Sequence, residues 1–278
     1  MHALPFAVAL ITAAMVAQPL QRALLQGGHT RPNYRSRALP FPFGVLILGA
    51  ALLALVPLAL VQRLASTEVF HAEALPVTLY CLGVLGLGLV DDLLGGAAPS
   101  QPRGWRGHGR ALARGELTTG TLKAAGSLGL ALLAMAYLPL SQGRWLLAAA
   151  VLVLATNLFN LLDLRPGRAV KALVLLGAGV LLATRELRPL WAVGLFAAPA
   201  LVAGLFDLRE RAMLGDTGAN LIGALAGAML VLSLPGTGQL VALALLLAAT
   251  LYGELRSISA LIERTPGLRE LDSWGRPS

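Results

Sequence analysis

Long apolar runs constrain this chain more than any other feature. About nine runs approach the roughly 20 mainly apolar residues that a helix needs to cross a bilayer. Hydrophobic residues make up 56% of the chain and charged residues only 13%, which lies far outside the composition of a soluble domain. The runs are 3–25, 41–62, 75–90, 121–140, 145–162, 170–184, 189–206, 217–234 and 238–255.

The pattern predicts an all-α fold, a polytopic integral membrane bundle of about nine transmembrane helices. We expect one membrane-embedded domain, 1–278. The first run lacks a basic start and a small-residue cleavage site, so we expect it to be retained rather than removed as a signal peptide. The predicted cytoplasmic segments are the loops 26–40, 91–120, 163–171 and 207–217 and the tail 256–278.

The distribution of basic residues predicts an orientation. The formal charge is +8, and an N-terminus outside the cell places nearly all of the Lys and Arg residues in the cytoplasmic segments. Only Arg63, Arg144, Arg185 and Arg188 then lie outside. This positive-inside asymmetry favours an N-out, C-in topology in the cell membrane, and it explains the basic excess by topology and anionic lipid, with no nucleic-acid partner. The single cysteine, Cys81, excludes an intrachain disulfide.

A stretch with many polar residues at 207–220 lies between the seventh and eighth apolar runs. Gly215-Asp216-Thr217-Gly218 stands where the eighth run begins. The glycines allow a tight turn and a close approach of the backbone to a ligand. The Asp216 carboxylate could cap the following helix, bind a divalent cation, or do both. Other polar clusters end apolar runs on the same predicted side, and they favour a site.

Two adjacent carboxylates, Asp91 and Asp92, end the third run. They face the negative end of a helix dipole and repel each other, so a metal ion, a proton or a basic ligand would relieve both penalties. The alternative is an ordinary charged helix terminus. Lys123 lies in the first turn of the fourth run, where the dipole disfavours a cation. It either extends to the interface or binds phosphate oxygens together with free N–H groups.

A polar stripe lies near the end of the fifth run. Asn157, Asn160 and Asp163 are spaced by three and share one helical face. Hydrogen bonding between helices would account for the asparagines but not for Asp163, so the stripe indicates a polar cavity.

Three further segments carry weaker signals. Asn33 and Arg37 lie in a basic, proline-containing loop that could equally touch lipid headgroups. The segment of about 98 to 117, with Trp105 and His108, is either a substrate lid or a loop lying on lipid. Apolar residues after position 257 predict short surface helices in the tail.

This set of motifs resembles the polyprenyl-phosphate N-acetylhexosamine-1-phosphate transferase superfamily. Members include phospho-N-acetylmuramoyl-pentapeptide transferase and undecaprenyl-phosphate N-acetylglucosamine-1-phosphate transferase. The resemblance covers nearly the whole chain in order. Its motifs are Arg31-Pro32-Asn33-Tyr34-Arg35, Asp91-Asp92, Lys123, Asn157-x-x-Asn160-x-x-Asp163 and Gly215-Asp216-Thr217-Gly218.

The resemblance implies an enzyme that moves a sugar 1-phosphate from a UDP-sugar to polyprenyl phosphate and releases UMP. It implies Mg²⁺, with Mn²⁺ as the alternative ion, and an active site facing the cytoplasm. Asp216 would bind the metal, Asp91 or Asp92 would bind the metal or deprotonate the acceptor, and Lys123 would neutralise phosphate. The predicted substrate-binding residues are Asn33, Asn157, Asn160, Asp163, Arg165 and Arg168. Association into a homodimer is left open.

Departures from the family pattern leave the sugar donor open. Leu164 to Arg168 follow Asp163 where the family has Gly and an acidic residue, and Met213 replaces an aromatic residue. A late histidine cluster and the final span are absent. A catalytically idle relative that binds or transports lipid-linked substrates is the alternative function. An ion-coupled transporter would predict inverted repeats, and the sequence shows none.

Overall fold

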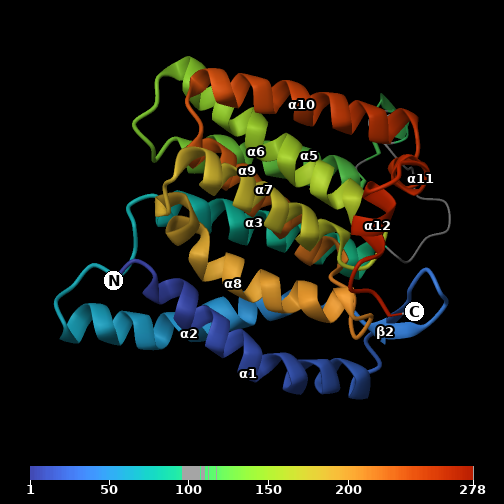
Figure 1. Cartoon of the computed structure of the whole chain (residues 1–278), viewed down its shortest axis with the longest axis horizontal. Helices are drawn as coiled ribbons and strands as arrows, with labels where there is room; N and C mark the ends of the chain where they lie inside the picture. The colour runs from blue at the N-terminus through green and yellow to red at the C-terminus, as the bar shows by residue number, and fades with distance from the viewer. Residues whose placement is uncertain (96–106, 108–109, 112, 117, 278) are drawn as a thin grey trace.

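The computed structural model describes the chain except for residues 96–106, 108–109, 112, 117 and 278. The described part is a helical bundle with one small hairpin (Figure 1). The long helices are α1 (Leu4–Gln26), α2 (Val45–Leu64), α3 (Ala74–Leu94), α5 (Thr119–Met135), α6 (Gln142–Leu162), α7 (Arg168–Thr184), α8 (Arg188–Leu208), α9 (Gly215–Ser233) and α10 (Gly236–Leu255).

Each predicted apolar run coincides with one of these helices, so the prediction of a polytopic helical membrane protein is confirmed. Seven helices in the described part are long and apolar enough to cross a membrane, namely α1, α2, α3, α6, α8, α9 and α10. The other two, α5 and α7, have 17 residues each. At 1.5 Å per residue such a helix is about 26 Å long, slightly less than the roughly 30 Å hydrocarbon core.

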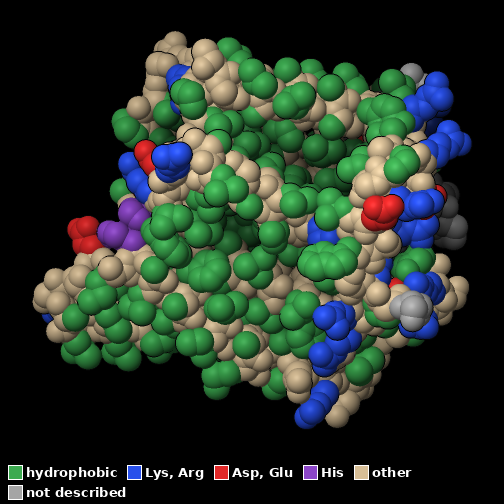
Figure 2. Space-filling view, viewed as in Figure 1, with side chains coloured by type: hydrophobic (Ala, Val, Ile, Leu, Met, Phe, Trp, Pro, Cys, Tyr) green, Lys and Arg blue, Asp and Glu red, His purple; other side chains and the backbone are tan. Residues whose placement is uncertain are grey.

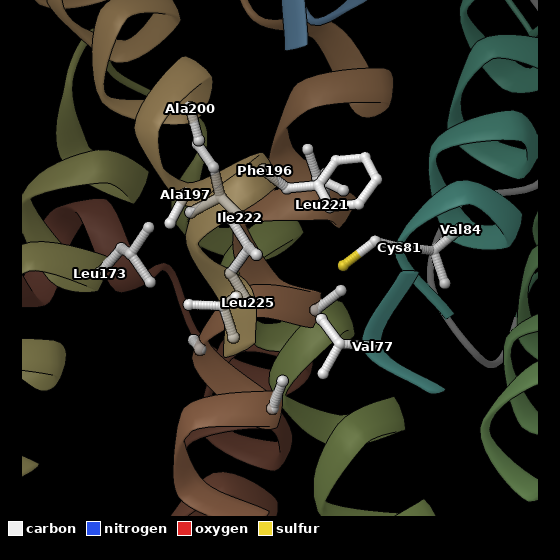
Figure 3. Packing of buried hydrophobic residues seen from close by; sticks show 14 of the residues in the cluster. Val77, Cys81, Val84, Leu173, Phe196, Ala197, Ala200, Leu221, Ile222 and Leu225 are labelled. Atoms are coloured by element: carbon white, nitrogen blue, oxygen red, sulfur yellow. The ribbon is translucent and has the colours of Figure 1, made fainter. Parts of the chain in front are cut away.

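Helix α9 lies at the centre of the bundle. Every residue from Thr217 to Val231 is buried, and the helix packs against α3, α6, α7 and α8. Its many Gly and Ala residues allow neighbouring backbones to approach closely. Leu221, Ile222 and Leu225 of α9 lie among side chains from α3, α7 and α8 (Figure 3). The first turn of α9 is therefore fixed relative to four other helices.

A glycine in α3 allows a close approach between α3 and α9. A Cβ atom at Gly88 would lie 2.5 Å from the backbone oxygen of Asp216 and 2.8 Å from the Cα of Thr217. Only glycine fits there, because backbone atoms cannot move aside as a flexible side chain can. This contact brings the last turn of α3 beside the first turn of α9.

The predicted basic loop after α1 contains an antiparallel hairpin of β1 (Thr30–Pro32) and β2 (Ala38–Pro40). The Asn33 Oδ1 accepts the backbone N–H groups of Arg35 and Arg37 at 2.9 and 3.0 Å. This side chain closes the turn by the local hydrogen bonding typical of asparagine. The prolines exclude a helix here, as expected, but the loop is ordered by its own asparagine.

The two predicted tail helices are present as α11 (Ile258–Arg264) and α12 (Leu268–Ser273). Apolar side chains cover the middle of the molecule, and most Lys and Arg residues of the face in Figure 2 gather at the end where α11, α12 and the C-terminus lie. Leu64, Leu182 and Leu245 are among the exposed apolar residues, as expected for helices that face lipid.

Candidate active site at the ends of α3, α5 and α9

Lys123 lies between two carboxylates from different helices. Its Nζ donates to Asp91 Oδ2 of α3 at 3.0 Å and also contacts Asp216 Oδ2 of α9. The three side chains are only 18% to 33% exposed. Three helix ends thus bring two anions and one cation to a single point, although the residues are far apart in the sequence.

Asp92 contacts α9 in a different way. Its carboxylate accepts the backbone N–H of Asp216 at 2.9 Å, the backbone N–H of Thr217 at 2.8 Å and the Thr217 hydroxyl at 2.5 Å. These N–H groups are among those that an α-helix leaves without partners at its start. The negative charge also complements the positive end of the helix dipole. Asp92 therefore caps α9 from a neighbouring helix.

This arrangement decides between the two interpretations of Asp216. Leu214 precedes α9 and makes no side-chain capping bond. The Asp216 carboxylate is directed to Lys123. Gly215 adopts a φ of +72°, which allows the turn into the helix. The capping interpretation is therefore wrong for Asp216, and its carboxylate is left to face the site. We name the group of Asp91, Asp92, Lys123 and Asp216 the Lys123 cluster.

Arg31 joins the hairpin to the Lys123 cluster. Its Nη2 donates to the backbone oxygen of Asp92 at 2.6 Å, and its guanidinium lies over the ring of Phe41 at 4.0 Å. A cation at the end of α3 complements the free carbonyl groups there. The hairpin therefore forms one wall of the site.

A cavity of about 390 Å³, which we name the loop cavity, opens beside the cluster. Its polar lining comes from the hairpin, the α6–α7 turn and the start of α9. The structure brings four predicted substrate-binding residues together there with Asp216 and Arg31. They are Asn33, Asn160, Asp163 and Arg165.

Asp163 lies just beyond the end of α6 on the wall of the loop cavity. Burial raises the pKa of its carboxyl well above the usual range, and the nearby carboxylates of Asp207 and Asp216 raise it further. Its position on the cavity wall suits hydrogen bonding to a polar ligand.

A second cavity of about 540 Å³, the helix groove, runs between α5, α6 and α10. Lys123 lies in its lining together with Ser127 and Asn157. The Asn157 Nδ2 is buried and has no hydrogen-bond partner among the described residues. Asn160 and Leu161 line both cavities, which are therefore adjacent; Lys123 lines the helix groove and Asp216 lines the loop cavity. The groove combines an apolar wall with donors that could bind oxygen atoms of a ligand.

Arg168 is placed differently from the other predicted residues. Its guanidinium is 5% exposed and binds both oxygens of Asp272 at 2.8 and 3.0 Å and the Ser259 hydroxyl at 2.9 Å. The structure does not bring it into either cavity. Arg165, by contrast, lies over the Tyr34 ring at 4.5 Å and lines the loop cavity.

Two acidic residues of the site were not predicted. Asp207 is buried, lines the loop cavity and accepts the Gly167 N–H at 2.6 Å. Glu210 is buried and accepts hydrogen bonds from Asn33 and Tyr34 at 3.1 and 3.0 Å. The sequence signal for Asp207 was a carboxylate at the end of an apolar run, the signal that identified Asp91 and Asp92, whereas Glu210 lies four positions beyond that run.

Two other predictions have different outcomes. Trp105 and His108, expected in a substrate lid, lie outside the described residues. Within the described residues, no group of three or more His, Cys, Asp or Glu side chains is arranged to bind a metal ion. A metal would therefore depend on fewer protein ligands and on oxygen atoms from a substrate.

Comparison with known proteins leaves the site to be interpreted by its geometry. The chain matches no model of a protein family. Nor does it match any curated protein.

The arrangement can bind anions and move a proton. Lys123 and Arg31 supply positive charge, and the carboxylates of Asp91 and Asp216 are oxygen ligands or proton acceptors. The loop cavity has several charged and amide side chains in its lining, and the helix groove runs between helices. Such a site suits chemistry between a polar anionic molecule and an anionic molecule with an apolar chain.

Proposed function

We propose that this protein transfers a sugar 1-phosphate, of the N-acetylhexosamine type, from a UDP-sugar to polyprenyl phosphate and releases UMP. The observation that carries the proposal is Lys123, held between Asp91 and Asp216, with Lys123 lining the helix groove and Asp216 lining the adjacent loop cavity. Cell-envelope glycan synthesis in the cell membrane, with the site facing the cytoplasm, is the expected setting.

The reaction joins two anions. A phosphate oxygen of the lipid attacks the β-phosphorus of the UDP-sugar, the new P–O bond forms, and the bond between the β-phosphorus and the bridging oxygen breaks. UMP leaves with that oxygen. Cations positioned at the developing charge, in a partly dry site, are the main source of acceleration for such transfers.

The residues of the Lys123 cluster have separate roles in this proposal. Lys123 neutralises phosphate oxygens, and Asp91 either helps to hold a metal or accepts the proton of the lipid phosphate when that phosphate enters protonated. Asp92 is a positioning residue because the described hydrogen bonds of its carboxylate are all to the start of α9. Asp216 is thereby held toward the site.

The donor set is compatible with Mg²⁺. Mg²⁺ in phosphate chemistry commonly has one or two carboxylate ligands and completes its shell with water and substrate phosphates. Asp91 and Asp216 already face a common cation, the Lys123 ammonium, so both carboxylates point to one place. They would hold the metal, which would supply charge neutralisation to the phosphates when bound.

The two cavities suit the two substrates. Arg165 and Asp163 in the loop cavity would bind the nucleotide-sugar, whereas Asn33 is held by its own turn and by Glu210. The helix groove with Asn157 would admit the lipid phosphate from the bilayer. Met213 lines the loop cavity where a stacking aromatic residue is expected of the family that the sequence resembles. We therefore expect poor turnover of UDP-N-acetylmuramoyl-pentapeptide, and efficient turnover of it would contradict this part of the proposal.

The test is UMP release by the purified protein from a panel of UDP-sugars, with undecaprenyl phosphate and Mg²⁺. We expect release with at least one donor, dependence on both the lipid and the metal, and loss on Asp216→Asn. Glu186→Gln is the matched control, because the Glu186 side chain is exposed and lines neither cavity. If no donor gives UMP release while an active enzyme of the same class does so in the same assay, the alternative is favoured, a catalytically idle relative that binds or transports lipid-linked substrates.

A further inference from the structure

The C-terminal tail lies across the turn between α6 and α7. Arg276 Nε donates to the backbone oxygen of Pro166 at 2.8 Å, and Lys171 Nζ donates to the backbone oxygens of Leu271 and Asp272 at 3.0 and 2.6 Å. These contacts join segments about a hundred positions apart. The tail therefore packs onto the α6–α7 turn, and Figure 1 shows α12 beside the end of α7.

Asp272 is the centre of these contacts. Its carboxylate accepts two hydrogen bonds from Arg168, at 2.8 and 3.0 Å, and one from Arg276 at 2.7 Å. The three side chains are 5% to 12% exposed. Paired geometry of this kind fixes the orientation of a guanidinium as well as its position. One carboxylate thus compensates two nearly buried positive charges.

The turn held by this pair is also fixed from its other side. Gly167 N–H donates to Asp207 Oδ2 at 2.6 Å, and Arg168 N–H donates to the Arg165 backbone oxygen at 3.2 Å. Asp207 belongs to α8, whereas Asp272 belongs to α12. The turn is therefore held between the bundle and the tail.

The same turn carries residues of the loop cavity. Asp163, Arg165 and Pro166 all line it. Arg165 is also touched by the tail, because its Nη2 lies 3.3 Å from Glu263 Oε1. The half of the cavity assigned to the nucleotide-sugar is thus built on a segment whose outer face is fixed by the tail.

We propose that Asp272 is a positioning residue for donor binding, acting through Arg168 and Arg276 on the turn that carries Asp163 and Arg165. This inference rests on the proposed function, since it assigns the tail to the donor half of that site. Asp272 touches neither cavity, so it contributes by holding the turn rather than by contacting a substrate.

The physical reason lies in the burial of Arg168. Asp272→Asn leaves a guanidinium that is 5% exposed without its carboxylate, and an uncompensated buried charge is strongly disfavoured. The side chain gains solvation by moving outward, and the turn moves with it. The Lys123 cluster lies on other helices, so its geometry is unchanged.

The kinetic test compares Asp272→Asn with the wild type in the UMP-release assay. We expect KM for the UDP-sugar to rise by about tenfold, with kcat within about twofold, because misplacement of binding groups weakens binding more than chemistry when reacting groups stay in place. Asp272→Glu keeps the charge and should recover most of the loss. The control is Glu270→Gln, in the same short helix, whose side chain is exposed.

A second measurement does not depend on activity. Hydrogen exchange of the full-length protein in detergent should be faster in the 163–171 segment of Asp272→Asn and unchanged in α9, while Glu270→Gln matches the wild type. An unchanged KM and unchanged exchange in Asp272→Asn would overturn the proposal. A wild type that releases no UMP with any donor would instead refute the proposed function and the donor role with it, and the exchange result would still decide whether Asp272 fixes the turn.

Discussion

Asp92 of α3 caps the N-terminus of α9 through the backbone N–H of Thr217, 2.8 Å from its carboxylate. Two adjacent aspartates at one helix end therefore have different partners, because Asp91 faces Lys123 while Asp92 faces the α9 backbone. Asp92 therefore holds the start of α9 in place, and Asp91 faces the site where a ligand would bind.

Replacement of Asp92 should reduce stability. Asp92→Asn turns one acceptor into a donor that faces N–H and O–H groups, and a buried unsatisfied group costs about 1–3 kcal/mol. We expect the midpoint of thermal unfolding in detergent to fall by several degrees. Glu186→Gln, an exposed change far from the cluster, is the control and should leave the midpoint nearly unchanged. Equal midpoints for the two variants would contradict the capping role of Asp92.

Replacement of Asp216 should affect activity alone. Asp216→Asn keeps the shape of the side chain and removes the charge that faces Lys123. We expect UMP release to fall by at least about 100-fold, the usual effect of removing one electrostatic group from an active site, with an unchanged unfolding midpoint. Activity near that of the wild type would refute the role of Asp216 in the site.

Replacement of Arg165 should weaken donor binding. Its guanidinium lines the loop cavity, and a charge-assisted bond to phosphate is stronger than a neutral one, so Arg165→Met should raise KM for the donor by about tenfold. Arg63→Met is the control because Arg63 is exposed in the last turn of α2, at the end that the predicted topology places outside. An unchanged KM would favour a purely lipid-facing role for Arg165.

The contact between tail and turn should depend on pH only in acid. Burial acts to raise the pKa of Asp272, but the hydrogen bonds from Arg168 and then Arg276 outweigh it, so the pKa is lowered overall. A carboxyl whose pKa is lower in the folded state than in the unfolded chain, where it is about 3.9, stabilises the folded state at any pH above that unfolded pKa. This stabilisation is lost as the pH falls through the pKa of the folded state.

Hydrogen-exchange protection of the tail should therefore stay constant from about pH 8 to about pH 5 and decline below about pH 4. Asp272→Asn should lower the protection throughout that range. A decline centred near neutral pH would show that another group controls the contact.

The predicted orientation can be tested by labelling. Cys81 is buried in the core, so a Cys81→Ala background removes the only native thiol. With the N-terminus outside, Arg269→Cys in the tail should react only from the cytoplasmic side and Glu68→Cys between α2 and α3 only from the external side. Labelling in the reverse sense, or external labelling of Asp216→Cys, would contradict the topology and with it the cytoplasmic site.

The apolar pattern of the sequence was sufficient to predict the helices. Apolar runs near the length of a bilayer leave the backbone few alternatives to a helix, so each run became one, and α11 and α12 followed from the spacing of apolar residues in the tail. Residue type and position at the run ends also indicated Asp91, Lys123, Asn160 and Asp216. These residues do line or form one site in the structure.

The contacts of each polar residue depend on the tertiary structure. Asp91 and Asp92 have different partners because α3 packs closely on α9 at Gly88, and no local sequence pattern encodes this packing. Arg168 and Arg165 are three positions apart, yet one is held by Asp272 from the tail and the other lines the loop cavity. Local sequence sets the backbone and the burial of a run, whereas the partner of a buried charge depends on which distant segment the fold brings within hydrogen-bonding distance.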